Sequence, residues 1–226
     1  MKKYTYWYPS TLTLLNLALG FLAMTLNHPV YSLALILAGC FLDVFDGILA
    51  RILHATSAFG KELDSLADIV TFGVAPAWLV YQLCMEHTTF NLLLVTLLPV
   101  FSAIRLAKFN NDDTQKTNFN GLPTPANGLF FASIPLLSQS MDLPSYALQS
   151  LILLFCLLMV APLRMFAFKD IKKGGPDTFF PLLFLLLILI ASFFLSLLVI
   201  PAGVLLYILL SVVYHWFLRK AQTLQP

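Results

Sequence analysis

Charged residues are scarce in this 226-residue chain: they make up only 11% of it, whereas 59% of the residues are hydrophobic. A water-soluble domain of this size typically contains about 25% charged residues, so a soluble globular fold is excluded. The 13 Lys and Arg residues nearly balance the 11 Asp and Glu residues, and the net charge of +2 is too small for a nucleic-acid-binding surface. The composition therefore indicates a protein of the lipid bilayer.

Cysteine and histidine are also rare, with three Cys and four His residues in the chain. Cys40, Cys84 and Cys156 each lie inside an apolar run, and an odd number in such positions does not indicate a disulfide framework. The histidines lie near the expected membrane boundaries without the spacing of metal ligands. We therefore expect neither a disulfide-stabilised fold nor a zinc site of the Cys–His type.

Apolar runs of about 20 residues, the length at which a helix crosses about 30 Å of hydrocarbon, recur along the sequence. They predict an all-α polytopic membrane protein with about eight transmembrane helices in one domain, residues 1–226. The predicted helices are Pro9–Asn27, Val30–Leu53, Gly60–Met85, Thr88–Phe109, Leu122–Met141, Pro144–Phe168, Thr178–Leu195 and Leu198–Leu218. Residues 30–85 form a hairpin, and residues 178–218 form a second, tight hairpin because one helix of that length is too long for the bilayer.

The N-terminal segment has two interpretations. Two lysines followed by apolar residues resemble a secretory signal, with Ala18 and Gly20 as small residues near a cleavage site. The apolar run continues through Leu26, however, and the aromatic residues between positions 4 and 8 are typical of an interfacial belt. We therefore expect this segment to be retained as the first membrane span.

The basic residues all fall at or near alternate connections between the predicted helices. They are Lys2, Lys3, Arg51, Lys61, Arg105, Lys108, Lys116, Arg164, Lys169, Lys172, Lys173, Arg219 and Lys220. The other connections, near residues 27–29, 86–87, 141–142 and 199, contain no Lys or Arg. By the positive-inside rule, both termini and the basic connections lie in the cytoplasm, at the cell membrane.

Acidic residues gather in the predicted hairpin. Asp43 and Asp46 are three positions apart and Asp64 and Asp68 are four apart, so each pair occupies one face of its helix. The antiparallel hairpin brings the two faces together, and only Arg51 and Lys61 lie between the pairs. Clustered carboxylates in a membrane protein are costly and need a compensating cation. Their all-oxygen character favours Mg²⁺ or Mn²⁺, with room for two ions.

Small residues accompany these acids. Gly39, Gly47 and Ala50 share a stripe of the second helix with its aspartates, and Gly60 precedes Asp64 by one turn. Such residues by themselves more often indicate close helix packing. Beside carboxylates that can hold metal, they favour room for a flat group to approach the backbone.

The spacing of these residues resembles that of a known family, the CDP-alcohol phosphotransferases. Its eight signature positions are matched by Asp43, Asp46, Gly47, Ala50, Arg51, Gly60, Asp64 and Asp68. The resemblance implies a helical membrane enzyme, commonly a homodimer, with a cytoplasmic site for a divalent metal and a CDP-linked substrate. It also implies that all four aspartates lie in the metal site, that Asp68 is the general base, and that the small residues make room for the nucleotide.

Three further stretches resemble the phosphatidylserine synthase branch of that family: residues 64–76, 105–110 and 119–126. Phosphatidylglycerolphosphate synthases more often have proline after the third aspartate and lysine after the fourth, where this chain has Ser65 and Ile69. Lys108 departs from the branch, which often has arginine there. Lysine keeps the charge but cannot make a bidentate contact.

This branch implies transfer of a phosphatidyl group from CDP-diacylglycerol to the hydroxyl of L-serine, with release of CMP. Asp68 would accept the serine proton and Arg51 would steady the diphosphate. The serine carboxylate needs a cation, for which Arg105, Lys108 and Arg164 are candidates. For Arg105 and Arg164, a role as snorkelling membrane anchors is about equally compatible with the sequence.

Two other functions stay open at this point. Another enzyme of the same reaction class would use glycerol 3-phosphate or an inositol phosphate, whose dianionic phosphate demands a denser basic pocket. An ion-coupled transporter would use intramembrane acids, but it predicts corresponding acids in two repeats and a pathway to both sides. Here the four acids lie in one hairpin near one face.

Overall fold

The structure is a computed structural model that describes residues 7–111, 119–166, 176–195 and 198–223, and it is almost entirely helical. The helical elements are α1 (Trp7–Leu26), α2 (Pro29–Ile52), α3 (Ala58–Asp68), the π-helix η1 (Ile69–Val74), α4 (Ala75–Cys84), α5 (Thr89–Val95), α6 (Leu97–Asn111), α7 (Thr124–Ser138), α8 (Ser145–Val160), α9 (Pro176–Leu195) and α10 (Val199–Thr223). Because α3, η1 and α4 run on continuously and α6 follows α5 directly, the described residues make eight helical passes. The predicted all-α polytopic fold is confirmed.

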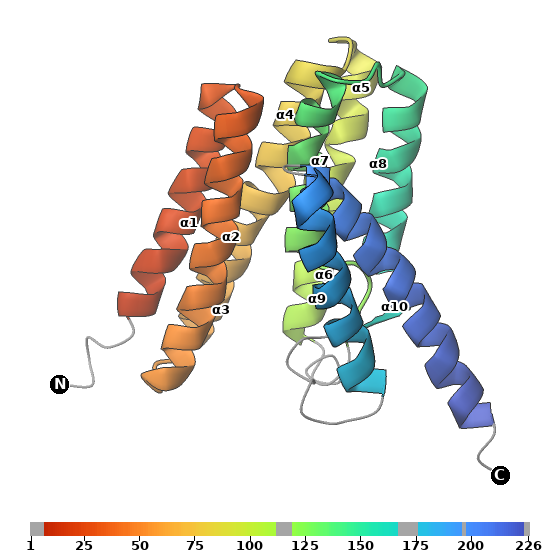
Figure 1. The fold of residues 1–226 in the computed structure, drawn as a ribbon. Coiled ribbons are helices and arrows are strands. Elements are labelled where there is room, and N and C mark those ends of the chain that lie inside the picture. Colours follow the sequence, from red (N-terminus) through yellow and green to blue (C-terminus); the bar gives the residue numbers. More distant parts are fainter. Residues whose placement is uncertain (1–6, 112–118, 167–175, 196–197, 224–226) are drawn as a thin grey trace.

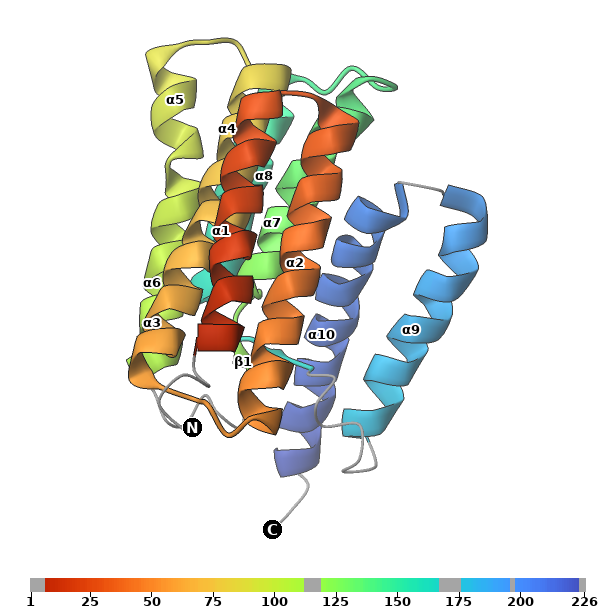
Figure 2. The same ribbon diagram turned by 90° about the vertical axis from the view of Figure 1, so that its left-hand side faces the viewer.

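The passes alternate in direction (Figure 1). Helices α1, α3 and α9 begin at the lower end of the molecule. Helices α2, α6 and α10 end there. Helices α1 and α2 lie side by side, and α9 and α10 form a hairpin that stands apart from them (Figure 2). The described residues therefore place the helix ends that carry Arg51, Lys61 and Lys108 at one end of the molecule, as the positive-inside pattern predicts.

The outer surface of the helices is apolar. Five helical passes are long and apolar enough to cross a membrane, and the segments 145–160 and 178–192 are shorter apolar helices. Large side chains such as Phe41, Leu157 and Leu209 are more than 60% exposed. An apolar surface this extensive is compatible with lipid and not with water, so the protein is an integral membrane protein.

The central pass is held by close contacts between helix backbones. A Cβ atom added to Gly128 of α7 would lie 2.6 Å from the Cβ atom of Phe72 in η1. A Cβ atom added to Gly20 of α1 would lie 2.5 Å from Oγ1 of Thr71. Glycines thus allow α1 and α7 to touch η1 from two sides, which matters in lipid because close packing drives association of membrane helices.

The π-helix begins directly after Asp68 and has a cause in the sequence. The N–H of Ala75 donates to the carbonyl of Val70, five residues earlier, which is the wider π pattern. Pro76 follows, and it has no N–H to donate to Phe72. A wider turn just before the proline accommodates its ring and shifts the helical faces beyond Asp68.

Two predicted helix ends are wrong by five residues or more: the eighth helix runs on from the expected Leu218 to Thr223, and the sixth ends early. The sixth helix was expected to continue to Phe168, but α8 ends at Val160. Pro162 explains the end, because it disfavours helical backbone at Ala161. The chain instead forms a short antiparallel ladder in which β2 (Arg164–Met165) pairs with β1 (Phe119–Asn120), and Gly121 follows β1 with a φ of +80°. The ladder was not predicted, and it places Arg164 outside a helix.

Candidate metal and substrate site

Three of the four predicted aspartates come together between α2 and α3. Carboxylate oxygens of Asp43, Asp64 and Asp68 all lie within 4.8 Å of one another. The spacing of four residues places Asp64 and Asp68 on one face of α3, and Asp43 faces them from α2. Asp68 is the most enclosed of the three, with 6% of its surface exposed.

The unpaired oxygens of this group fit a cation. The Oδ1 atoms of Asp64 and Asp68 are buried and have no hydrogen-bond partner among the described residues. A buried carboxylate oxygen without a partner is costly, and a group of them is more so because like charges repel. Hard divalent cations such as Mg²⁺ and Mn²⁺ prefer such oxygen ligands. The group is therefore suited to bind one.

Asp46 lies next to this group and has a different partner. Its Oδ2 atom accepts a hydrogen bond of 2.6 Å from Oγ1 of Thr13 in α1, and only 5% of its surface is exposed. Asp46 does not belong to the three-carboxylate group, although it is close enough to interact electrostatically with Asp64 and Asp68. The hydrogen bond fixes one carboxylate oxygen of Asp46 toward α1.

A cavity of about 470 Å³ opens beside the carboxylates, and it is called the polar cavity because seven of its thirteen lining residues are charged or carry a hydroxyl. Two of the aspartates and three of the small signature residues line it, together with the start of α3. The lining residues are Pro9, Ser10, Thr13, Asp46, Gly47, Ala50, Ala55, Thr56, Ser57, Ala58, Gly60, Lys61 and Asp64. The predicted nucleotide-binding residues Gly47, Ala50 and Gly60 thus share one cavity wall.

Arg51 lies between this cavity and a second, apolar one. Its Nε atom donates to the carbonyl of Gly47 at 2.9 Å, and a Cβ atom added to Gly47 would meet only the terminal nitrogen of Arg51, at 4.0 Å. The backbone at Gly47 is therefore open to a ligand. The apolar cavity, about 880 Å³ in volume, lies between α2, α7, α9 and α10, and Arg51 is part of its wall.

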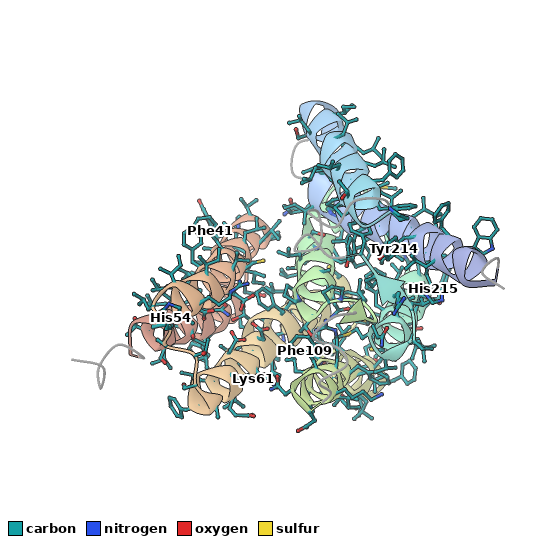
Figure 3. The ribbon with its side chains drawn as sticks, turned by 90° about the horizontal axis from the view of Figure 1, so that it is seen from below. Phe41, His54, Lys61, Phe109, Tyr214 and His215 are labelled. Carbon is teal, nitrogen blue, oxygen red and sulfur yellow. The ribbon has the colours of Figure 1, made fainter. Side chains whose placement is uncertain are left out.

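The start of α3 is tied to the end of α6. Nζ of Lys61 donates to the carbonyl of Asn110 at 2.7 Å, and Nδ2 of Asn110 donates to Oγ of Ser65 at 2.8 Å. Figure 3 shows Lys61 and Phe109 side by side at this end. Two of the stretches that resemble the serine branch, residues 64–76 and 105–110, therefore meet beside the site.

The three cations considered for the serine carboxylate lie in different surroundings. Arg105 is 8% exposed, donates from Nη1 to Oγ1 of Thr124 at 3.0 Å, and is close enough to interact electrostatically with Asp68. Lys108 is exposed one turn further along α6. Arg164 is half-buried in β2, where its backbone N–H donates to Nδ1 of His215. Of these three, the structure brings Arg105 to the carboxylates.

The sequence did not single out several polar residues that the structure places at the site. Thr13 holds Asp46, and Ser57 accepts the N–H of Gly60 at the start of α3. Thr124 and Asn127 are fully buried in α7. Thr13 and Asn127 are polar residues inside apolar spans. A polar residue in such a position indicates a structural or functional role, but the sequence does not show which residue it contacts.

Comparison with known proteins agrees with the geometry. The family model for CDP-alcohol phosphatidyltransferase matches residues 6–162, and the chain belongs to this family. Among curated relatives, the CDP-diacylglycerol–serine O-phosphatidyltransferase of Helicobacter pylori is 31% identical over 195 residues, 82% of each chain. The enzymes of the same name from Bacillus subtilis and Mycobacterium leprae are 41% and 42% identical over 54% of this chain, which corresponds to 71% and 44% of their own lengths.

Proposed function

We propose that this protein is a phosphatidyltransferase that joins CDP-diacylglycerol and L-serine to give phosphatidylserine and CMP, in a metal-dependent reaction. The observation that carries the proposal is the group formed by Asp43, Asp64 and Asp68, whose unpaired oxygens lie beside a polar cavity. The relatives named as serine O-phosphatidyltransferases support the choice of acceptor.

The two cavities fit the two parts of CDP-diacylglycerol. The polar cavity takes the cytidine and diphosphate, with the open backbone at Gly47 against the nucleotide. Arg51 lies at the junction and binds the diphosphate. The apolar cavity takes an acyl chain: from Arg51 to Leu37 its wall follows α2 for 14 residues, or about 21 Å, which exceeds half of a 30 Å hydrocarbon core.

The chemistry is a single displacement at phosphorus. The serine hydroxyl oxygen forms a bond to the phosphorus that bears diacylglycerol, and the bond from that phosphorus to the bridging oxygen breaks, so that CMP leaves with the electron pair. Asp68 accepts the hydroxyl proton. Asp43, Asp46, Asp64 and Asp68 would hold Mg²⁺ or Mn²⁺, as one or two ions, and the metal would neutralise charge at the diphosphate and polarise the phosphorus.

We further propose that the site faces the cytoplasm, that both termini lie there, and that the enzyme forms a homodimer in the cell membrane. The orientation is supported by the basic residues at the helix ends on the side of the site. The dimer is supported by the family resemblance. Both can be tested by labelling engineered cysteines from one side of the membrane and by measuring the mass of the purified protein.

The central test is CMP release by the purified protein from CDP-diacylglycerol, with L-serine, glycerol 3-phosphate and an inositol phosphate as parallel acceptors. We expect release with serine in Mg²⁺ or Mn²⁺ and none after chelation. Release with glycerol 3-phosphate but not serine would overturn the acceptor, and turnover without metal would overturn the role of the carboxylates. Arg105 is the one buried cation among the described side chains, and a single cation fits a carboxylate better than a dianionic phosphate.

A further inference from the structure

Asn16, in the middle of α1, is a buried polar residue to which the reaction described above gives no role. Its side chain has no exposed surface, and neither Nδ2 nor Oδ1 has a hydrogen-bond partner among the described residues. A buried amide without a partner is costly, and polar groups inside a membrane span are usually functional. The surroundings of Asn16 therefore indicate its role.

Close packing fixes the position of this side chain. Helix α1 lies against α2 and α3 (Figure 2), and Oγ1 of Thr71 in η1 donates to the carbonyl of Asn16 at 2.9 Å. On the other side, a Cβ atom added to Gly39 of α2 would lie 2.7 Å from Oδ1 of Asn16. Glycine is needed at position 39 because it leaves room for the amide. Position 39 lies one turn before Asp43, so the amide lies near the carboxylate group.

The amide of Asn16 lies within reach of Asp68. The two side chains are close enough for the amide to act on the carboxylate, and Thr71, which holds the backbone of Asn16, follows Asp68 by three residues. Oδ1 of Asp68 is also buried without a partner among the described residues. A carboxylate only accepts hydrogen bonds and an amide nitrogen only donates them, so each side chain can satisfy the other.

A neighbouring contact shows the same arrangement. Thr13, one turn before Asn16 on the same face of α1, donates to Oδ2 of Asp46 at 2.6 Å. Helix α1 thus presents two uncharged donors, one turn apart, to aspartates on two different helices. An uncharged donor orients a carboxylate without neutralising it, whereas a lysine in this position would compete with a bound cation.

We propose that Asn16 is a positioning residue whose Nδ2–H group donates to the carboxylate of Asp68 and holds that side chain in its reactive orientation. The inference rests on the proposed function, in which Asp68 accepts the hydroxyl proton, and it adds the residue that orients this base. The alternative is that Oδ1 of Asn16 binds the metal ion, since amide oxygens are also ligands of hard cations. Oδ1 lies against Gly39 of α2, which favours donation by Nδ2 toward Asp68.

Two substitutions of similar volume distinguish these roles. In each variant, kcat and the KM values for CDP-diacylglycerol and L-serine are measured as CMP release by the purified protein at saturating metal. Asn16→Leu removes both amide atoms, so kcat should fall by about 10- to 100-fold, the range for groups that orient a functional side chain, with both KM values unchanged. Asn16→Asp replaces the donor by a carboxylate that repels Asp68, so kcat should fall at least as far. Retention of kcat by Asn16→Asp would overturn the proposal and would indicate an oxygen ligand.

A measurement without metal tests the contact independently of turnover. In EDTA, the Asn16→Asp protein should unfold at a lower temperature than the Asn16→Leu protein, because it adds an uncompensated carboxylate beside Asp68. Equal stability of the two variants in EDTA would overturn the proposal, because the side chain at position 16 would then not face Asp68.

A matched control separates positioning from the packing of α1. Ser32 is also fully buried and joins α2 to α1, by donation to the carbonyl of Ala23 at 2.7 Å. Ser32→Ala should leave kcat unchanged. A loss as large as that of Asn16→Leu would assign the effect to helix packing and overturn the proposal.

Thr71→Val tests the same contact while keeping Asn16, and it serves where Asn16→Leu does not fold. It removes the hydrogen bond to the carbonyl of Asn16, so kcat should fall by about two- to tenfold, the effect of one neutral hydrogen bond. Unchanged kcat in this variant would contradict the proposal. Absence of serine-dependent CMP release from the unmodified protein would instead contradict the proposed function, and the order of stabilities in EDTA would still test the contact with Asp68.

Discussion

The carboxylate group on α2 and α3 and the buried polar residues Ser102, Arg105, Thr124 and Asn127 on α6 and α7 lie along the same central pass, but they are assembled differently. The carboxylates come from one hairpin, and their spacing in the sequence already places them on matching helical faces. Ser102 and Asn127 come from different helices, α6 and α7, and each helix packs closely on η1 at a glycine, Gly73 and Gly128 respectively. Helical spacing in one hairpin thus assembles the carboxylate group, whereas tertiary packing brings the buried polar residues of α6 and α7 to the central pass.

The largest effect should follow from removing the base. Asp68→Asn keeps the shape of the side chain but cannot accept a proton, so kcat should fall by about 10²- to 10⁴-fold. The measurement is CMP release at saturating serine and metal. Asp142→Asn, on an exposed connection near the start of α8, is the matched control and should retain full activity. Full turnover by Asp68→Asn would contradict the proposed role.

Loss of the support to Asp46 should have a smaller effect. Thr13→Val removes the 2.6 Å hydrogen bond to Oδ2 but keeps the volume of the side chain. We expect the metal concentration for half-maximal activity to rise by about 10- to 100-fold, the range for residues that orient metal ligands. Thr25→Val, which removes a hydroxyl bonded only to the carbonyl of Leu22, is the control. An unchanged metal requirement would place Asp46 outside the metal site.

Arg51 connects the nucleotide cavity to the apolar one, and its removal should affect the lipid substrate alone. Arg51→Ala should raise KM for CDP-diacylglycerol by about tenfold, because a charge-assisted hydrogen bond to the diphosphate is lost. KM for serine should not change. Arg51→Lys should recover part of the affinity. A rise in KM for serine instead would indicate that Arg51 binds the acceptor and not the diphosphate.

The smallest effect concerns the C-terminal hairpin, which lies outside residues 6–162 matched by the family model. Gly203 and Ile188 both line the apolar cavity, and a Cβ atom at Gly203 would lie 2.7 Å from Cδ1 of Ile188. Gly203→Leu should narrow the cavity. Turnover of long-chain relative to short-chain CDP-diacylglycerol should then fall by a few-fold, roughly the effect of losing the contacts of one or two methylene groups. Leu209→Ala, on the exposed face of α10, should leave the ratio unchanged.

Much of the fold could be predicted from the sequence because membrane helices are constrained by length and hydropathy alone. The boundary of α8 could not be predicted from apolar character, because Leu163 and Phe166 continue the apolar run while Pro162 ends the helix. The π-helix after Asp68 was missed for a related reason: Pro76 acts on residues before it, inside a run with uniform hydropathy.

For the site, the spacing of the signature gathered Asp43, Asp64 and Asp68 correctly, but it could not separate Asp46 from them. Three residues along a helix still share a face, and the contact with Thr13 depends on how α1 packs against α2. Their predicted positions at helix ends likewise made Arg105, Lys108 and Arg164 equally good candidates to bind the serine carboxylate. Packing against α7 buried Arg105 and left Lys108 in contact with solvent.

The sequence by itself determined that this is a polytopic helical membrane protein with four acids at fixed spacing near the end of one hairpin, since hydrophobic length and helical periodicity are local properties. Only the tertiary structure decided which polar groups meet around Asp68. Gly20, Gly73 and Gly128 permit contacts that bring α1, α6 and α7 against one central pass, and no local pattern encodes which helices approach each other so closely.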